Sequence, residues 1–130
     1  MIAQTVSPAT DPCELAKKWK IDPYIARRIV AMCNSVPFPF QIISGFRTAS
    51  QQEELIAAGK GAPVELSTHC SCPATGVDLW PLVTVTNIVK ASLGAAGTYE
   101  NLRWGGGSPV DEDTGIPEDW NHFDMGPRAR

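Results

Sequence analysis

The sequence predicts an α+β fold, in which a small antiparallel sheet packs against helices from the N-terminal half and the middle of the chain. Helix-start signals gather in residues 11–34, whereas short apolar runs separated by Gly- and Pro-containing loops fill most of the later chain. Helices followed by short strands are typical of α+β proteins. The length of 130 residues suits a single domain, residues 1–130, with one modest core.

The N-terminal region contains two helix starts after a short polar segment. Residues 1–10 are small and polar, and we expect them to form a loose arm. Asp11 and Asp22 each precede a proline, which is the pattern of an N-cap followed by proline at the first helical position. The second helix should run to about residue 34, because its apolar residues recur at helical spacing and prolines follow.

The rest of the chain mixes short strands with helices and loops. Thr48 is the expected N-cap of a third helix. In the strand after the central loop, Val77 and Leu79 should lie on the face opposite Asp78. The expected elements are a strand at 40–44, a helix at 48–59, an irregular loop at 60–73, a strand at 75–80, a helix at 87–96 and strands at 100–104 and 120–125.

Charge and hydropathy exclude several classes of partner. The net charge is −3 with no basic run, which argues against nucleic acid as the main partner. The longest apolar stretches, such as residues 25–32, are short and interrupted by arginines, so we expect no membrane partner. The N-terminus lacks the charged start and apolar segment of a secretory signal. We therefore expect a chain that is made in the cytoplasm without a signal peptide, and we expect it to be a monomer.

Both histidines lie in short motifs whose residue types indicate one zinc site. His69 ends a Ser-Thr-His segment that is followed by Asp78, and His122 lies in the segment Asp-Trp-Asn-His-Phe-Asp. Two neutral imidazoles and a carboxylate, with a fourth position left to water, form the ligand set of a hydrolytic zinc centre. The sequence therefore predicts Zn²⁺ bound by His69, Asp78 and His122.

Three further residues complete the predicted chemistry. Asp119, three residues before His122, is the expected general base that takes a proton from water, with the adjacent Glu118 as a competitor. Arg47 follows a strand and a glycine, and its guanidinium suits a carbonyl oxygen that gains negative charge or a substrate carboxylate. Ser67 is a small hydrogen-bonding partner that could contact the substrate.

Taken together, these segments resemble the LAS-type zinc metallopeptidases. That family includes D-Ala-D-Ala carboxypeptidases and dipeptidases, and the L-alanyl-D-glutamate endolysins of tailed phages. The resemblance covers about residues 40–125 and is greatest to the small single-domain endolysins. It is carried by Ser44-Gly45-Phe46-Arg47-Thr48, Ser67-Thr68-His69, Gly76-Val77-Asp78-Leu79, Trp104-Gly105-Gly106 and Asp119-Trp120-Asn121-His122-Phe123-Asp124.

The resemblance implies a function and a role for each motif residue. It places zinc on His69, Asp78 and His122, makes Asp119 the catalytic base, and makes Arg47 a substrate contact. The implied function is hydrolysis of the peptidoglycan stem peptide, with the L-Ala-D-Glu bond favoured. The alternatives are a D-Ala-D-Ala carboxypeptidase or dipeptidase, and a metal-containing module that binds the cell wall without catalysis.

The implied place of action follows from the same resemblance. A chain without a signal peptide fits a phage lysin that a separate membrane-permeabilising protein releases to the cell wall, or a virion component. It fits a cytoplasmic dipeptidase equally well, so a phage or a bacterial origin stays open.

The cysteines mark a departure from the family pattern. The family usually places six residues between its first histidine and the aspartate, whereas eight residues separate His69 from Asp78 here, among them Cys70 and Cys72. We expect the two thiols to have a structural role in a bulged loop; the alternative is that one of them binds zinc, which would put Asp78 in doubt. The other two cysteines, Cys13 and Cys33, fall on consecutive expected helices. We expect them to pack as small apolar groups, and the alternative is a disulfide between them.

Overall fold

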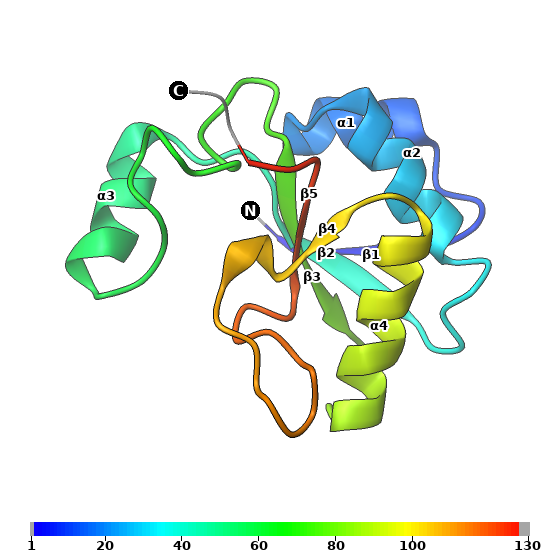
Figure 1. Cartoon of the computed structure of the whole chain (residues 1–130). Helices are drawn as coiled ribbons and strands as arrows, with labels where there is room; N and C mark the ends of the chain where they lie inside the picture. The colour runs from blue at the N-terminus through cyan, green and yellow to red at the C-terminus, as the bar shows by residue number, and fades with distance from the viewer. Residues whose placement is uncertain (1, 128–130) are drawn as a thin grey trace.

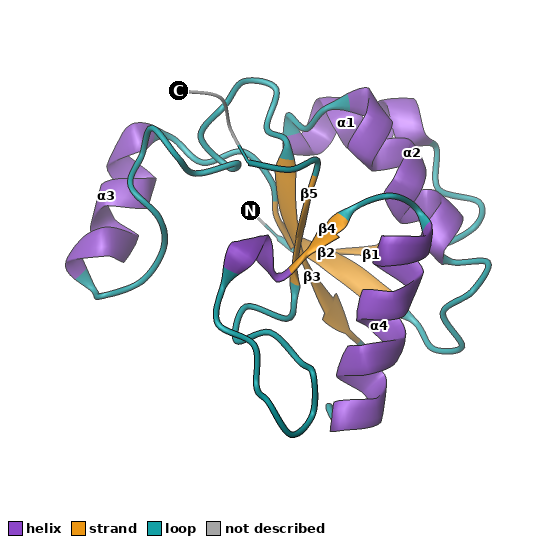
Figure 2. Cartoon of the chain, in the orientation of Figure 1, coloured by secondary structure: helices purple, strands orange, loops and turns teal. Residues whose placement is uncertain are grey.

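The computed structural model describes residues 2–127, and within them it contains one five-stranded antiparallel sheet and four α-helices (Figures 1 and 2). This arrangement confirms the predicted α+β fold. The strands are β1 (Gln4–Val6), β2 (Phe40–Ser44), β3 (Gly76–Pro81), β4 (Arg103–Trp104) and β5 (His122–Asp124). The helices are α1 (Pro12–Trp19), α2 (Pro23–Met32), α3 (Ala49–Ala57) and α4 (Asn87–Tyr99), with a short 3-10 turn at η1 (Gly105–Gly107).

The first three helices begin where the sequence predicts. The Asp11 carboxylate accepts a hydrogen bond of 2.9 Å from the backbone N–H of Cys13, and Asp22 accepts one of 2.8 Å from Tyr24. Thr48 forms a capping box with Gln51, in which each side chain accepts a hydrogen bond from the backbone of the other residue. These caps satisfy amides that have no partner within the helix.

The prediction of a loose N-terminal arm is wrong for part of residues 1–10. Gln4–Val6 forms β1, which pairs antiparallel with β2. Val6 is buried in the core, and the Gln4 side chain accepts a hydrogen bond of 3.0 Å from the indole of Trp19. The edge of β2 thus supplies backbone hydrogen-bond partners, and these order the segment although it has few apolar residues to bury.

The sheet has one apolar face and one polar face. Val77, Leu79 and Phe123 are fully buried in the main core cluster. Because side chains alternate along a strand, Asp78 and His122 lie on the other face, as the sequence predicts for Asp78. The strand order β1-β2-β3-β5-β4 places the C-terminal strand β5 between β3 and β4.

Three of the helices cover the apolar face. The core cluster draws its largest members from α1, α2, α4 and the sheet, which include Leu15, Trp19, Ile25, Ile29, Met32, Leu93, Phe40 and Ile42. In contrast, α3 stands apart from the sheet and is followed by a long loop that leads to β3 (Figure 1), and Gln52 is its buried residue. The polar face of the sheet borders a cavity to which α3 contributes Gln52 and Leu55.

The later strands are shorter than the sequence predicts. Helix α4 extends to Tyr99, and Asn101 then adopts a left-handed conformation with φ 63°, so β4 begins only at Arg103. Strand β5 likewise covers His122–Asp124, within the predicted range 120–125. Within residues 2–127, no helix is long and apolar enough to cross a membrane.

The apolar face should dominate the stability of the protein. Replacing Ile42→Ala removes a fully buried side chain from β2 and should lower the free energy of unfolding by about 2–5 kcal/mol, since a cavity remains. Replacing Ile88→Ala, whose side chain is 79% exposed, should change it by less than about 0.5 kcal/mol. Denaturant unfolding measures both values, and equal losses would contradict this assignment of the core.

Candidate metal centre

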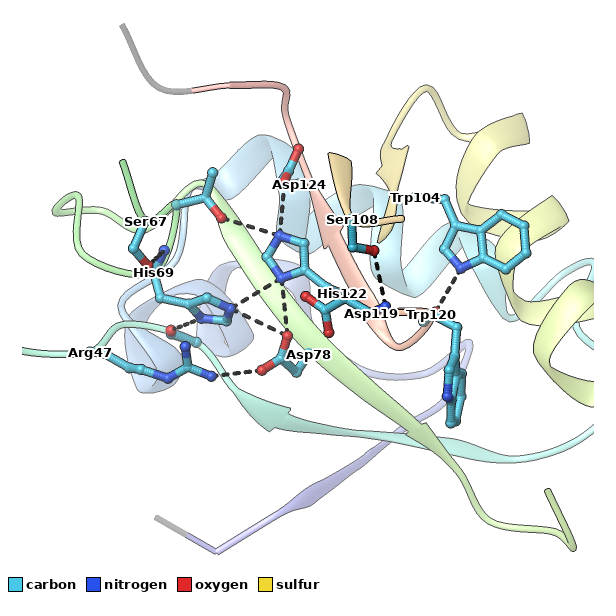
Figure 3. Close-up of polar contacts among 12 residues, drawn as sticks. Arg47, Ser67, His69, Asp78, Trp104, Ser108, Asp119, Trp120, His122 and Asp124 are labelled. Carbon is cyan, nitrogen blue, oxygen red and sulfur yellow. Dashed lines mark hydrogen bonds and ion pairs between the residues drawn. The ribbon is translucent and has the colours of Figure 1, made fainter. Parts of the chain in front are cut away.

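Three side chains on the polar face converge on one point (Figure 3). His122 Nδ1 lies 3.1 Å from Asp78 Oδ1 and 3.2 Å from His69 Nε2, and His69 Nε2 lies 3.3 Å from Asp78 Oδ1. Around a tetrahedral zinc, ligand bonds of 2.0–2.1 Å put neighbouring ligand atoms about 3.3–3.4 Å apart. The three predicted ligands therefore present one atom each at nearly the spacing that a tetrahedral metal ion requires.

Backbone pairing sets this convergence. Asp78 on β3 and His122 on β5 are directly opposite partners in the antiparallel register, so their side chains meet on one face. His69 reaches them from the loop before β3, and its carbonyl accepts a hydrogen bond of 2.7 Å from the backbone N–H of Arg47. Gly76 allows the close approach, because a Cβ there would meet the Thr68 side chain and lie 3.0 Å from His122 Cε1.

The outer nitrogens of both imidazoles are held by acceptors. His69 Nδ1 lies 2.6 Å from the carbonyl oxygen of Gly45, so this nitrogen carries the proton and donates it. His122 Nε2 lies 2.8 Å from Asp124 Oδ2 and donates to that carboxylate in the same way. Each hydrogen bond leaves the inner nitrogen as the ligand atom, a pattern common to histidines that bind metals.

Asp124 and Arg103 are functional candidates for which the sequence predicted no role. Asp124 is fully buried, and both of its oxygens accept hydrogen bonds of 2.8 Å from the guanidinium of Arg103. One signal was available, because residues two apart on a strand share a face, and Asp124 follows His122 by two. The cross-strand pairing of Asp124 with Arg103 depends on the register of β4 and β5, which the sequence does not disclose.

The site attracts positive charge. Burial alone would raise the pKa of Asp78, but the contacts of its carboxylate with the imidazoles of His122 and His69, when these carry protons, outweigh it and hold that pKa well below its usual value. Burial would lower the pKa of His122, yet the carboxylates of Asp124 and Asp78 raise it to about 9. The negative charge that retains a proton here would also retain a metal cation.

Arg47 lies beside the same cluster and contacts a candidate ligand. Its Nη2 is 2.7 Å from Asp78 Oδ2, and its Nη1 donates a hydrogen bond of 3.3 Å to Gln52 of α3. Gln52 in turn donates to the carbonyl of Ala62 at 2.8 Å. Arg47 thus fixes the second oxygen of Asp78, and its predicted contact with a substrate stays a prediction.

The cluster lines a cavity of about 600 Å³, which can admit a ligand. Its walls include Arg47, Ser67, Asp119 and the three candidate metal ligands. Ser67 is buried, and its hydroxyl accepts a hydrogen bond of 3.3 Å from the backbone N–H of His69. Its predicted role toward a substrate therefore stays a prediction.

Asp119 is directed toward the cluster. Figure 3 shows its carboxylate turned to the space beside Asp78 and His122. Partial withdrawal from water, together with the charge of Asp78, raises the pKa of Asp119 above its ordinary value, although His122 and other cations oppose this. Backbone contacts hold the turn, since the Asp119 N–H donates to Ser108 and its carbonyl accepts from His122. Glu118 lines the same cavity, so proximity alone does not exclude it as a base.

The thiols lie outside the ligand group. Among residues 2–127, the cluster that could hold a metal consists of His69, Asp78 and His122, without Cys70 or Cys72. The loop between the first two ligands closes on itself, because the Thr68 carbonyl accepts hydrogen bonds from the N–H groups of residues 75 and 76. The residues of this loop therefore bulge without separating the candidate ligands. All four cysteines are free thiols, so the alternative disulfide between Cys13 and Cys33 is not formed.

Comparison with known proteins identifies a fold. No family model matches the chain, and no curated protein matches it. Among solved structures, the chain is similar to the crystal structure of the L-Ala D-Glu endopeptidase ChiX of Serratia marcescens, with a TM-score of 0.66, 20% sequence identity and 84% of each chain covered. At this identity the similarity shows that the two chains share a fold, and membership of the LAS-type family stays a prediction.

Metal binding should stabilise the folded protein. A ligand present at one hundred times its dissociation constant adds about 2.7 kcal/mol to the free energy of unfolding. Zinc should therefore raise the unfolding temperature measured by calorimetry, and a chelator should reverse the shift. His69→Gln should abolish the shift, whereas the double variant Cys70→Ser/Cys72→Ser should keep it. A shift that survives in the first variant and disappears in the second would assign the metal to the thiols.

Proposed function

We propose that the protein is a zinc-dependent peptidase that hydrolyses the stem peptide of peptidoglycan at the L-Ala-D-Glu bond. One observation carries the proposal, namely that His69, Asp78 and His122 converge at metal-ligand spacing beside a cavity that also contains Asp119. The similarity of fold to an L-Ala D-Glu endopeptidase supports the choice of substrate. The roles of the site residues and the zinc ion are part of this proposal.

The donor set favours zinc. Two imidazole nitrogens and one carboxylate oxygen suit this ion, and the metal-facing side of the cluster lines the cavity, where a substrate could enter. A zinc ion bound there supplies Lewis acidity, which acidifies water and polarises a peptide carbonyl. The protein contributes fixed ligand geometry, because both imidazoles are held from behind by acceptors.

Asp119 and Arg47 perform the remaining steps. Asp119 accepts a proton from the attacking water and returns it to the leaving amine, for which a carboxylate with a raised pKa is suited. Arg47 offers positive charge at the edge of the cluster to the carbonyl oxygen that becomes negative. Its guanidinium is positioned for this role by Asp78 and Gln52.

The charges in the cavity favour an endopeptidase over a carboxypeptidase. A carboxypeptidase needs a further cation for the terminal carboxylate of its substrate. Of the arginines that line this cavity, Arg103 is paired with Asp124, and Arg47, paired with Asp78, already serves the carbonyl oxygen. The exposed Lys60 also lines the cavity, and this residue is the observation that keeps the D-Ala-D-Ala carboxypeptidase or dipeptidase as the second candidate. The proposal includes a monomeric enzyme that reaches the cell wall after phage-type release or as a virion component.

Digestion of purified peptidoglycan tests the reaction. The zinc-loaded protein should release fragments with new N-terminal D-Glu, which mass analysis of the termini identifies. Release of D-Ala would favour the carboxypeptidase or dipeptidase. Cell-wall binding without any new terminus would favour a non-catalytic module and would overturn the proposed hydrolysis.

Replacement of Asp119 tests the proposed base. Asp119→Asn should lower kcat by about 10²–10⁴-fold while the zinc content stays near that of the wild type, because the carboxylate moves a proton and is not a ligand. Glu118→Gln is the matched control, since Glu118 is adjacent and lines the same cavity, and it should keep most of the activity. The reverse outcome would transfer the role to Glu118, and loss of zinc from Asp119→Asn would make this residue a ligand.

A further inference from the structure

Asp124 is a carboxylate buried where an ionised group is costly. Its side chain is fully shielded from solvent. An uncompensated buried charge is strongly unfavourable, so such a group needs a complete set of partners. Asp124 has that set: Oδ1 accepts from Arg103 Nε and from the backbone N–H of Gly126, and Oδ2 accepts from Arg103 Nη2 and His122 Nε2, each at 2.8 Å. The carboxylate therefore has one defined orientation.

The strand register explains how Arg103 and His122 meet the same carboxylate. Arg103 on β4 is the direct cross-strand partner of Asp124 on β5. His122 precedes Asp124 by two residues on the same strand and projects from the same face. The planar guanidinium donates two parallel hydrogen bonds, a geometry that restricts rotation of the carboxylate.

The orientation of the carboxylate decides which nitrogen of His122 can be a ligand. Oδ2 of Asp124 faces Nε2 and accepts its proton in a hydrogen bond. The unprotonated lone pair then lies on Nδ1, the atom 3.1 Å from Asp78 Oδ1 and 3.2 Å from His69 Nε2. For His69 the acceptor at the outer nitrogen is the neutral carbonyl of Gly45. For His122 the nearer partner of Nε2 is the charged carboxylate of Asp124, at 2.8 Å, and the neutral hydroxyl of Thr68 lies farther, at 3.3 Å.

We propose that Asp124, held in place by Arg103, is a positioning residue that selects Nδ1 of His122 as the third metal ligand. The inference rests on the proposed function in that it requires a metal at this cluster. Asp124 faces the far side of the imidazole, so it acts on the metal only through the ring of His122. Partners of this kind typically change metal affinity by about 10–100-fold.

Asp124→Asn is the direct test. An amide has one acceptor oxygen, so it cannot accept from both His122 and the two nitrogens of Arg103. The dissociation constant for zinc, measured by competition with a chromophoric chelator, should increase by about 10–100-fold. Asp113→Asn makes the same chemical change in an exposed loop and should leave the constant within about twofold of the wild type.

A spectroscopic measurement separates positioning from general destabilisation. In the zinc-loaded wild type, the Nε2 proton of His122 should give a downfield, slowly exchanging NMR signal, because it is buried and bonded to a carboxylate. In Asp124→Asn this signal should be lost or should move markedly. A merely structural role would lower the unfolding temperature of the metal-free protein and leave the dissociation constant for zinc unchanged, even where the signal moves.

A second variant keeps the test valid if Asp124→Asn does not fold. Arg103→Lys retains the positive charge and loses the two parallel hydrogen bonds, so zinc affinity should fall, by less than in Asp124→Asn. Unchanged zinc affinity in every variant that folds would overturn the inference and leave the proposed function intact. Failure of the wild type to bind zinc at all would overturn the proposed metal site and this inference with it.

Discussion

The antiparallel pairing of β3 with β5 is the constraint on which the rest of the site depends. It places Asp78 directly opposite His122, and two residues further along it places Gly76 opposite Asp124. A shift of one residue in this register would turn Asp78 toward the helices and move Val77 or Leu79 into the cavity. The apolar face prevents that shift, since both of these side chains are fully buried in the core. The hydrophobic core thus fixes the alignment of the polar cluster, although the core side chains are apolar and carry no charge.

Charge is arranged around the cluster in pairs. Each buried or partly buried carboxylate next to a histidine has its own arginine, with Arg47 on Asp78 and Arg103 on Asp124. Pairing of this kind offsets the cost of withdrawing the carboxylates from water. A cation held at the cluster would then keep charge that the two carboxylates do not fully neutralise, which would suit a Lewis acid. Asp119 differs, because no arginine among residues 2–127 forms an ion pair with its carboxylate, and its raised pKa is consistent with a group that exchanges protons.

The residues of the candidate cluster could be predicted from the sequence, whereas most of their contacts could not. His69, Asp78 and His122 could be predicted because their types match a ligand set and because period-two alternation separates Asp78 from Val77 and Leu79. The choice of Nδ1 or Nε2 depends on acceptors supplied by other segments, which no local pattern contains. The same reason explains why Asp124 was left without a role. Strand β1 was missed because three residues carry little periodicity, and the open edge of β2 decides their conformation.

The loop that carries Cys70 and Cys72 shows that hydrogen bonds at the two ends of a loop fix the positions of the candidate ligands more strongly than the number of residues between them. On one side, the carbonyl of His69 is bonded to the N–H of Arg47, which ties this ligand to the end of β2. On the other side, the carbonyl of Thr68 is bonded to the N–H groups of residues 75 and 76, where β3 begins. Residues between these attachments can be added at the modest entropic cost of a longer loop. The length of this loop therefore does not decide the positions of His69 and Asp78, whose ligand atoms lie close enough to hold one ion.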